Sequence, residues 1–125
     1  MNDSHLILGV DIGGTGIKAA VVDTRKGTLT TDVARLKTPQ PATPKAVVAA
    51  LGELAKRLKW RGAVGVGFPG LLKQGVVRRA PNLDPAWVRH EIVDNLQRAL
   101  NVPLVAVGND ADAAGLAEEI GRAHV

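Results

Sequence analysis

The feature that most constrains this chain is an apolar run that ends in a pair of glycines. Residues 6–13 read LILGVDIG, and their nearly continuous apolar character predicts a strand buried on both faces. Residues 17–24 (IKAAVVDT) form a second β-like run, which closes at the turn RKG. This second run leaves no room for a helix of ordinary length. The chain is therefore expected to begin as two strands joined by a glycine-rich turn.

Two familiar phosphate motifs fail at this turn. Residues 14–19 (GTGIKA) satisfy the dinucleotide pattern G-x-G-x-x-G/A, but that motif works because a helix follows the glycines, and here a strand follows. A P-loop needs Gly-Lys followed by Ser or Thr, whereas Lys18 lies between Ile17 and Ala19. What remains is a glycine-rich hairpin.

The hairpin nevertheless carries groups that suit a phosphate. Gly13 and Gly14 lack side chains, so their N–H groups can approach an anion closely. Thr15 adds a hydroxyl, Lys18 a point charge, and Asp11 a carboxylate suited to hydrated Mg²⁺. An ordinary hairpin with a solvated lysine is the alternative. The combination of Asp, Thr and Lys at one turn favours phosphate binding.

The following segments predict a meander and then a capped helix. Residues 28–36 alternate and are expected to form a third, half-exposed strand. Residues 38–44 (TPQPATP) are a rigid connector, in which Thr43 is suited to cap a helix with Pro44 in its first turn. The inner face of that helix is expected to carry Val47, Val48, Leu51, Leu54, Ala55 and Leu58.

The rest of the chain alternates strands and helices. Residues 63–68 and 103–108 read as buried strands, and residues 71–80 as a hairpin around Gly75. A helix is expected to start at Asp84 and Pro85, and another at Asn109 or Asp110. The inner face of the helix that starts at Asp84 is expected to carry Val88, Ile92, Leu96 and Ala99. This order predicts an α/β fold: a mixed sheet flanked by helices, as in a ribonuclease-H-like, actin-like ATPase half.

A second group of polar residues follows the last strand. Asn109 suits hydrogen bonds to a sugar hydroxyl, and the carboxylate of Asp110 is suited to take a proton from an attacking hydroxyl. Both also suit a helix N-cap, and that alternative stays open. Gly70, after another buried strand, allows a ligand to approach the backbone, and Asn82 offers an amide near a helix start, although a turn role suits Asn82 equally well.

The composition of the chain limits the kinds of ligand and partner that we expect it to bind. There is no cysteine, the three histidines are scattered, and the formal net charge of +4 fits an anionic ligand. One Phe, two Trp and no Tyr leave few stacking residues, so we expect no nucleic-acid partner. No apolar run reaches the ~20 residues that span a bilayer, and no signal peptide is visible, so we expect a cytoplasmic protein with no membrane partner.

These motifs occur together and in this order in one known family. On GVDIGGTGIK, TPQPATP, GFPG, GVVRRAPNLD and NDADAAGLAE, the chain resembles the ROK-type sugar kinases, and among them most nearly the bacterial polyphosphate glucokinases. The resemblance covers residues 6–118. It implies a glucokinase that uses Mg²⁺ with polyphosphate or ATP as phosphoryl donor and glucose as acceptor, and a full-length form that is a homodimer.

The resemblance also implies a role for each candidate residue. Asp110 would be the general base, and Asn109, Asn82, Asp110 and the Gly70 backbone would hold the sugar. The transferred phosphate would lie at Gly13, Gly14, Thr15 and Lys18, with Asp11 near Mg²⁺. The basic residues Lys73, Arg78 and Arg79 would guide a polyphosphate chain, unless they are simply a solvated hairpin.

The resemblance stops short of a whole enzyme. Family members are about twice as long, so residues 1–118 are expected to be the N-terminal domain, with the C-terminal domain absent and the isolated chain inactive. A ROK repressor, which binds sugar without phosphorylating it, is less expected because the chain begins close to its first strand. A non-catalytic fragment is the other alternative.

The last seven residues depart from the family. Residues 119–125 (EIGRAHV) back-translate to GAG ATC GGA AGA GCA CAC GTC, which after its first base matches a widely used sequencing-library adapter. We therefore expect a non-native tail, which resequencing of the source locus would test.

Overall fold

The glycine turn joins two long antiparallel strands, as expected. The computed structural model describes residues 5–109. In it β1 (Leu6–Ile12) pairs with β2 (Gly16–Asp23) over its whole length, and Ile12 lies opposite Ile17 at the turn. Both of these isoleucines are fully buried. The prediction of a strand, a turn and a strand is confirmed.

The prediction of one continuous third strand over residues 28–36 is wrong. Two short strands, β3 (Thr28–Leu29) and β4 (Ala34–Lys37), pair separately with β2. Between them the hydroxyl of Thr31 accepts the N–H of Val21 at 3.0 Å, and the N–H of Thr30 donates to the Val21 carbonyl at 2.8 Å. A side chain thus takes the place of a main-chain ladder bond, and this interrupts the strand.

The first helix begins where its capping signals predict. In α1 (Pro44–Arg57) the Thr43 hydroxyl accepts the N–H of Ala46 at 3.2 Å, and Pro44 occupies the first turn. Its last turn carries Lys56 and Arg57, which suit the negative end of the helix dipole. The helix buries Val47, Leu51, Leu54 and Ala55.

Two parallel strands extend the sheet beyond β1. β5 (Val64–Phe68) pairs with β1, and β8 (Val105–Asn109) pairs with β5, which gives the order β3-β2-β1-β5-β8 with β4 also on β2. A separate hairpin follows β5. It consists of β6 (Leu71–Lys73) and β7 (Val76–Arg79), and its turn residues Gln74 and Gly75 both have positive φ, as a tight type I′ turn requires.

The helix expected from Asp84 is broken. A single 3-10 turn, η1 (Pro85–Trp87), starts there. The helix α2 (Ile92–Leu100) begins five residues after the end of that turn. Trp87 is fully buried and its indole N–H donates to the Ala42 carbonyl at 2.7 Å. Arg89 then takes a φ of 73°, and its backbone N–H donates to the Val77 carbonyl at 2.8 Å. These tertiary bonds override the helical pattern.

The break also changes which side chains face inward. Ile92 and Leu96 are buried as expected, together with Trp87, which packs at 5.0 Å between ring centroids against Phe68. The expected inward placement of Val88 and Ala99 is wrong, because both are exposed. Val88 falls in the non-helical link, where the helical period no longer applies.

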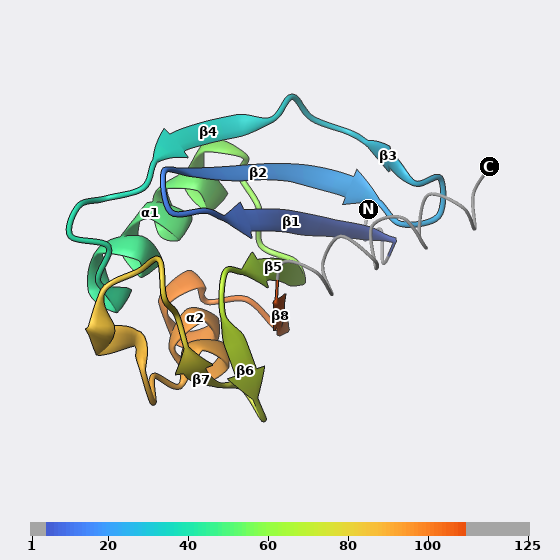
Figure 1. Ribbon diagram of the computed structural model, residues 1–125. Helices are drawn as coiled ribbons and strands as arrows, with labels where there is room; N and C mark the ends of the chain where they lie inside the picture. Colours follow the sequence, from blue (N-terminus) through green and yellow to red (C-terminus); the bar gives the residue numbers. More distant parts are fainter. Residues whose placement is uncertain (1–4, 110–125) are drawn as a thin grey trace.

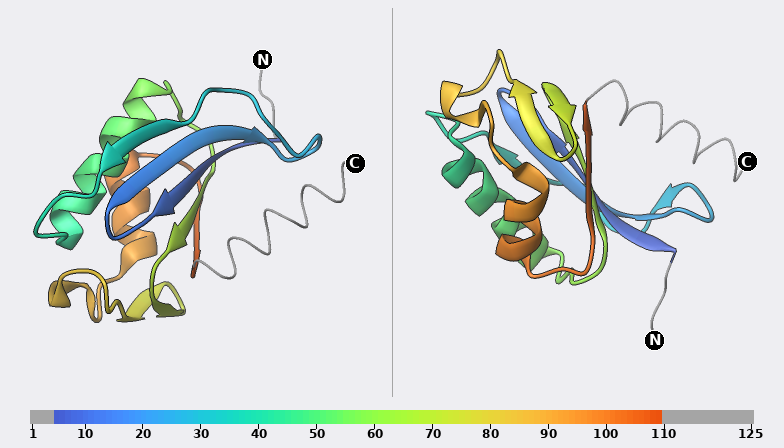
Figure 2. Two further views of the ribbon diagram at one scale, coloured as in Figure 1. Left: turned by 45° about the horizontal axis from the view of Figure 1, so that its top comes forward. Right: turned by 90° about the horizontal axis from the view of Figure 1, so that it is seen from below.

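The two helices pack on one face of the sheet. Helices α1 and α2 cover the same face of the sheet (Figure 1), and the right-hand view of Figure 2 shows both on one side of the strands. β1, β5 and β8 run in parallel, so their carboxyl ends reach the same edge. Within the described residues, no helix has the length and apolar character needed to cross a bilayer.

Candidate active site at the carboxyl edge of the sheet

Strand register brings Asp11 and Asn109, two predicted site residues far apart in the sequence, to one edge. Asp11 near the end of β1 lies opposite Gly67 of β5, Gly67 lies opposite Gly108 of β8, and Phe68 lies opposite Asn109. Neighbouring strands are ~4.8 Å apart, so the backbones at Asp11 and Gly108 are separated by roughly 10 Å. Asn109 is half-buried.

The acid and the lysine of the turn share a face. Asp11 and Lys18 are direct cross-strand partners, and such partners project to the same side with Cβ atoms ~5 Å apart. Both side chains are exposed, whereas their neighbours Ile12 and Ile17 are buried toward the helices. Asp11 and Lys18 therefore lie on the face that α1 and α2 leave uncovered.

The proline connector holds all three carbonyl groups of the turn. The Thr38 hydroxyl donates to the Gly13 carbonyl at 2.6 Å, and the Thr38 N–H donates to the Thr15 carbonyl at 3.2 Å. The Gln40 amide donates to the Gly14 carbonyl at 3.2 Å. Thr38 is only 4% exposed. The oxygen atoms that would repel an anion are thus tied to the connector.

The N–H groups of the turn are disposed differently. That of Gly13 donates to the Gly16 carbonyl at 2.9 Å, which closes the turn. Those of Gly14 and Thr15 have no hydrogen-bond acceptor in the structure over residues 5–109. Amide donors without acceptors, beside carbonyl groups that are already hydrogen-bonded, suit the binding of an anion.

Asn82 lies against this turn, although 68 positions separate it from Gly14. A methyl group placed on Gly14 would lie 3.6 Å from the Asn82 carbonyl oxygen and 3.7 Å from its Cβ. The N–H of Leu83 donates to the Ala80 carbonyl at 3.1 Å, which makes a turn around Asn82. The predicted sugar-binding amide and the predicted phosphate turn are therefore neighbours.

Gly70 has a packing reason to be glycine. A Cβ at this position would collide with the carbonyl oxygen of Arg79 and with the ring of Phe68. The close approach is made by the chain itself, where the segment after β5 crosses the end of β7. A role for the Gly70 backbone in sugar binding remains a prediction.

The predicted general base falls outside the described residues, as does the expected tail over residues 119–125. Asp110 directly follows Asn109, the last residue of β8. Sequence reasoning missed Thr38 and Gln40, which hold the turn. Their polar side chains between prolines were the available signal, but only the path of the connector reveals their partners.

No ion pair recorded among the described residues occupies the charged side chains at this edge. In the described part of the chain the recorded ion pair is Arg57 with Glu53, at 3.9 Å on α1. No cluster of three potential metal-binding His, Cys, Asp or Glu residues occurs there. A single carboxylate, Asp11, fits Mg²⁺ that is otherwise held by water and phosphate oxygens, because Mg²⁺ keeps much of its hydration.

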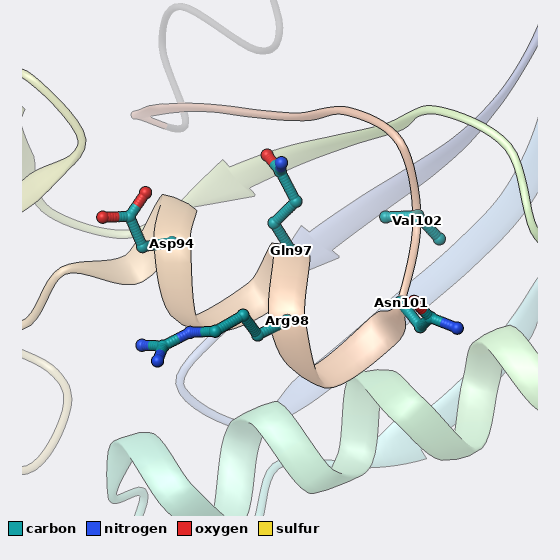
Figure 3. Close-up of a pocket in the computed structure, with 5 residues that line it drawn as sticks. All are labelled: Asp94, Gln97, Arg98, Asn101 and Val102. Atoms are coloured by element: carbon teal, nitrogen blue, oxygen red, sulfur yellow. The ribbon is translucent and has the colours of Figure 1, made fainter.

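A hollow elsewhere on the surface has no comparable chemistry. It lies along α2 and the loop after it, and is lined by Asp94, Gln97, Arg98, Asn101 and Val102. Figure 3 shows Asp94 and Arg98 extending to one side of α2, while Gln97 and Asn101 extend in other directions. Because Val102 precedes β8, this hollow lies at the opposite, amino-terminal edge of the sheet.

Comparison with known proteins shows the fold and the family of the chain. The element order is that of the actin-like ATPase fold, which a Bacteroides thetaiotaomicron protein of that fold shares at 11% identity and a TM-score of 0.51. A family model described as ROK family matches residues 7–124. The chain belongs to the ROK family.

Three relatives define its neighbourhood within the family. A polyphosphate glucokinase of Mycobacterium tuberculosis is 46% identical over 110 residues, which are 88% of this chain and 42% of the relative. The crystal structure of an inorganic polyphosphate/ATP-glucomannokinase from Arthrobacter sp. strain KM matches 98% of this chain and 51% of its own, at 43% identity and a TM-score of 0.88. A Streptomyces griseus ROK family glucokinase in complex with glucose and AMPPNP matches 88% and 35%, at 35% identity and a TM-score of 0.77. The chain thus spans about half or less of these relatives.

Proposed function

We propose that this chain is the N-terminal part of a glucokinase that transfers a phosphoryl group from inorganic polyphosphate or ATP to the 6-hydroxyl of glucose. The observation that carries the proposal is the glycine turn. Its amides at Gly14 and Thr15 have no acceptor in residues 5–109, its carbonyls are held by Thr38 and Gln40, and Asn82 lies against it. The names of the relatives supply the reaction type.

The turn supplies the electrostatic part of the reaction. Phosphoryl transfer depends mainly on positioning and on neutralising the charge of the phosphoryl oxygens. Gly14 and Thr15 present amide dipoles in a turn that the Gly13 N–H closes, and Lys18 adds a full positive charge from the adjacent strand. Mg²⁺ near Asp11, when bound, would neutralise further phosphate charge.

The sugar is assigned to polar groups beside the turn and along the same edge. Asn82 and Asn109, with the Gly70 backbone, would hold hydroxyl groups, and Asp110 would accept the proton of the 6-hydroxyl as its oxygen attacks phosphorus. The bond between that phosphorus and the bridging oxygen of the donor then breaks, and the shortened donor leaves with the electron pair. General-base assistance of this kind contributes roughly 10²- to 10⁴-fold in rate.

The test uses the full-length protein encoded at the source locus. It is supplied with glucose and Mg²⁺, together with ATP or polyphosphate, and glucose 6-phosphate is measured. We expect turnover with at least one donor, and an Asp110→Asn variant that folds normally but loses roughly 10²- to 10⁴-fold in kcat. Sugar binding without turnover would contradict the proposal and favour a sugar-responsive regulator. The 125-residue chain alone is expected to show little or no activity.

A further inference from the structure

Three cations lie beside the glycine turn, and two of them are on β4, a strand that was not assigned to the site. Lys18 of β2 is the direct cross-strand partner of Arg35 on β4, and Gly16 is the partner of Lys37. Direct partners share a face of the sheet, as do residues two apart on one strand. Lys18, Arg35 and Lys37 therefore project from the same face, and all three are exposed.

This face is the one that carries Asp11. Leu36, between Arg35 and Lys37, packs against the core on the side of α1, so its two neighbours point away from the helices. Lys37 lies opposite Gly16 and so beside the turn, while Lys18 and Arg35 form the next pair on this face, two residues further from the turn.

The pairing of β2 with β4 carries an unfavourable charge contact on this face. Like charges directly opposite each other in an antiparallel pair are destabilising, and Lys18 opposite Arg35 is such a pair. Neither residue, nor Lys37, has an ion-pair partner in the structure of residues 5–109. The nearest acid by register is Asp11, on the other side of Lys18. An external anion is what would relieve the repulsion.

The spacing suits a linear anion. Cβ atoms of direct partners are ~5 Å apart, and residues two apart on a strand are separated by ~7 Å. Charges at these intervals, continuing from a turn that binds a terminal phosphate, match a chain with a charge on every unit. A single phosphate at the turn would leave Arg35 unused, because Arg35 lies on β4 and two residues further from the turn than Lys37.

We propose that Lys18, Arg35 and Lys37 form a track that binds the chain of a long inorganic polyphosphate whose terminal unit lies at the glycine turn. This track rests on the proposed function, because the turn must hold the reacting phosphate. The β6–β7 hairpin is less suitable as a track for polyphosphate. Arg78 and Arg79 are adjacent on β7, and successive strand residues point to opposite faces, so they cannot form one row with Lys73.

The experiment measures equilibrium binding to the full-length protein. The probes are long-chain polyphosphate and pyrophosphate, and the variants are Arg35→Ala/Lys37→Ala, the charge-preserving Arg35→Lys/Lys37→Arg, and a control, Lys45→Ala/Lys56→Ala. The control removes the same charge from α1, on the other face of the sheet. A fourth variant, Lys73→Ala/Arg78→Ala, tests the hairpin. Glucose 6-phosphate formation is measured in parallel.

The track predicts a selective weakening. Arg35→Ala/Lys37→Ala should weaken long-chain binding by about tenfold at low salt, from a factor of roughly two to five for each exposed charge contact. The slope of log affinity against log salt concentration should fall by about one for each cation that no longer pairs with a phosphate. Pyrophosphate binding should change by less than about threefold, and the charge-preserving variant should bind the long chain as the parent does.

The opposite results separate the track from the proposed function. The track is wrong if Arg35→Ala/Lys37→Ala binds long chains like the parent, if the control on α1 weakens binding equally, or if only the hairpin variant weakens it. Selective weakening in a protein that forms no glucose 6-phosphate would support the track and overturn the proposed function alone.

Discussion

Replacement of Thr38 by valine should loosen the glycine turn from a distance. The hydroxyl is removed from a side chain that is 4% exposed and that donates at 2.6 Å to the Gly13 carbonyl. A typical hydrogen bond contributes about 0.5–1.5 kcal/mol net, and a carbonyl left buried without a partner costs about 1–3 kcal/mol. Gly13 is half-buried, so its carbonyl regains only part of its hydration. We therefore expect a loss of about 1–2 kcal/mol in the free energy of unfolding.

The assay combines urea unfolding with steady-state kinetics of the full-length enzyme. Thr38→Val should lower the unfolding midpoint and reduce kcat/KM for the phosphoryl donor, because the turn amides are less well positioned; a loss of about 1.4 kcal/mol in their binding of the phosphoryl group would appear as a factor of ten. KM for glucose should change by less than about twofold, because the sugar groups come from other segments.

Two matched variants make the test specific. Thr38→Ser keeps the hydroxyl and should restore the donor kinetics, while Gln40→Ala removes an exposed bond of 3.2 Å and should cost less than about 1 kcal/mol. The reasoning would be refuted if Thr38→Val matched the parent in stability and donor kinetics, or if serine proved no better than valine.

Three further outcomes follow from the fold. Gly70→Ala should destabilise the protein by about 1–3 kcal/mol in urea unfolding, because its Cβ meets the Arg79 carbonyl and the Phe68 ring; an unchanged midpoint would contradict this packing. Trp87→Phe should cost about 2–4 kcal/mol, since it leaves the Ala42 carbonyl without its donor and opens a void, and a loss below about 1 kcal/mol would argue against the buried bond. Burial lowers the pKa of His90, partly opposed by Glu91, so this residue favours folding above its unfolded pKa of about 6.5 and loses that contribution as the pH falls toward its folded pKa. Unfolding measured between about pH 7 and pH 5 should show a steeper decline in stability for the parent than for His90→Gln, and equal slopes would refute the assignment.

Local signals predicted the elements whose partners are close in sequence. The β1–β2 hairpin, the Thr43 cap of α1 and the turn at Gly75 each depend on residues within a few positions, and all three are confirmed. The actin-like order of strands and helices followed from these elements and the buried runs.

The departures have a common physical cause, which is contact between distant segments. The third strand is interrupted because the Thr31 hydroxyl bonds to Val21 on the neighbouring strand. The helix at Asp84 ends because Trp87 donates to Ala42, 45 residues earlier. No local pattern contains these partners.

The candidate site likewise contains some residues that a local sequence pattern reveals and others that only the tertiary structure reveals. Asp11, Gly13, Gly14 and Thr15 were recognisable because the groups adjoin one another in sequence. The support from Thr38 and the alignment of Arg35 with Lys18 required the connector path and the β4 register. Asp110 follows the described residues, so its place at the edge stays a prediction.

The central claim is that the amides of Gly14 and Thr15 form the anion site. The most direct measurement is a titration of the isotopically labelled full-length protein with pyrophosphate, followed through its backbone amide resonances. The account predicts that the resonances of Gly14 and Thr15 shift most and saturate together. Saturable binding that leaves both amides unchanged while resonances elsewhere shift would contradict it.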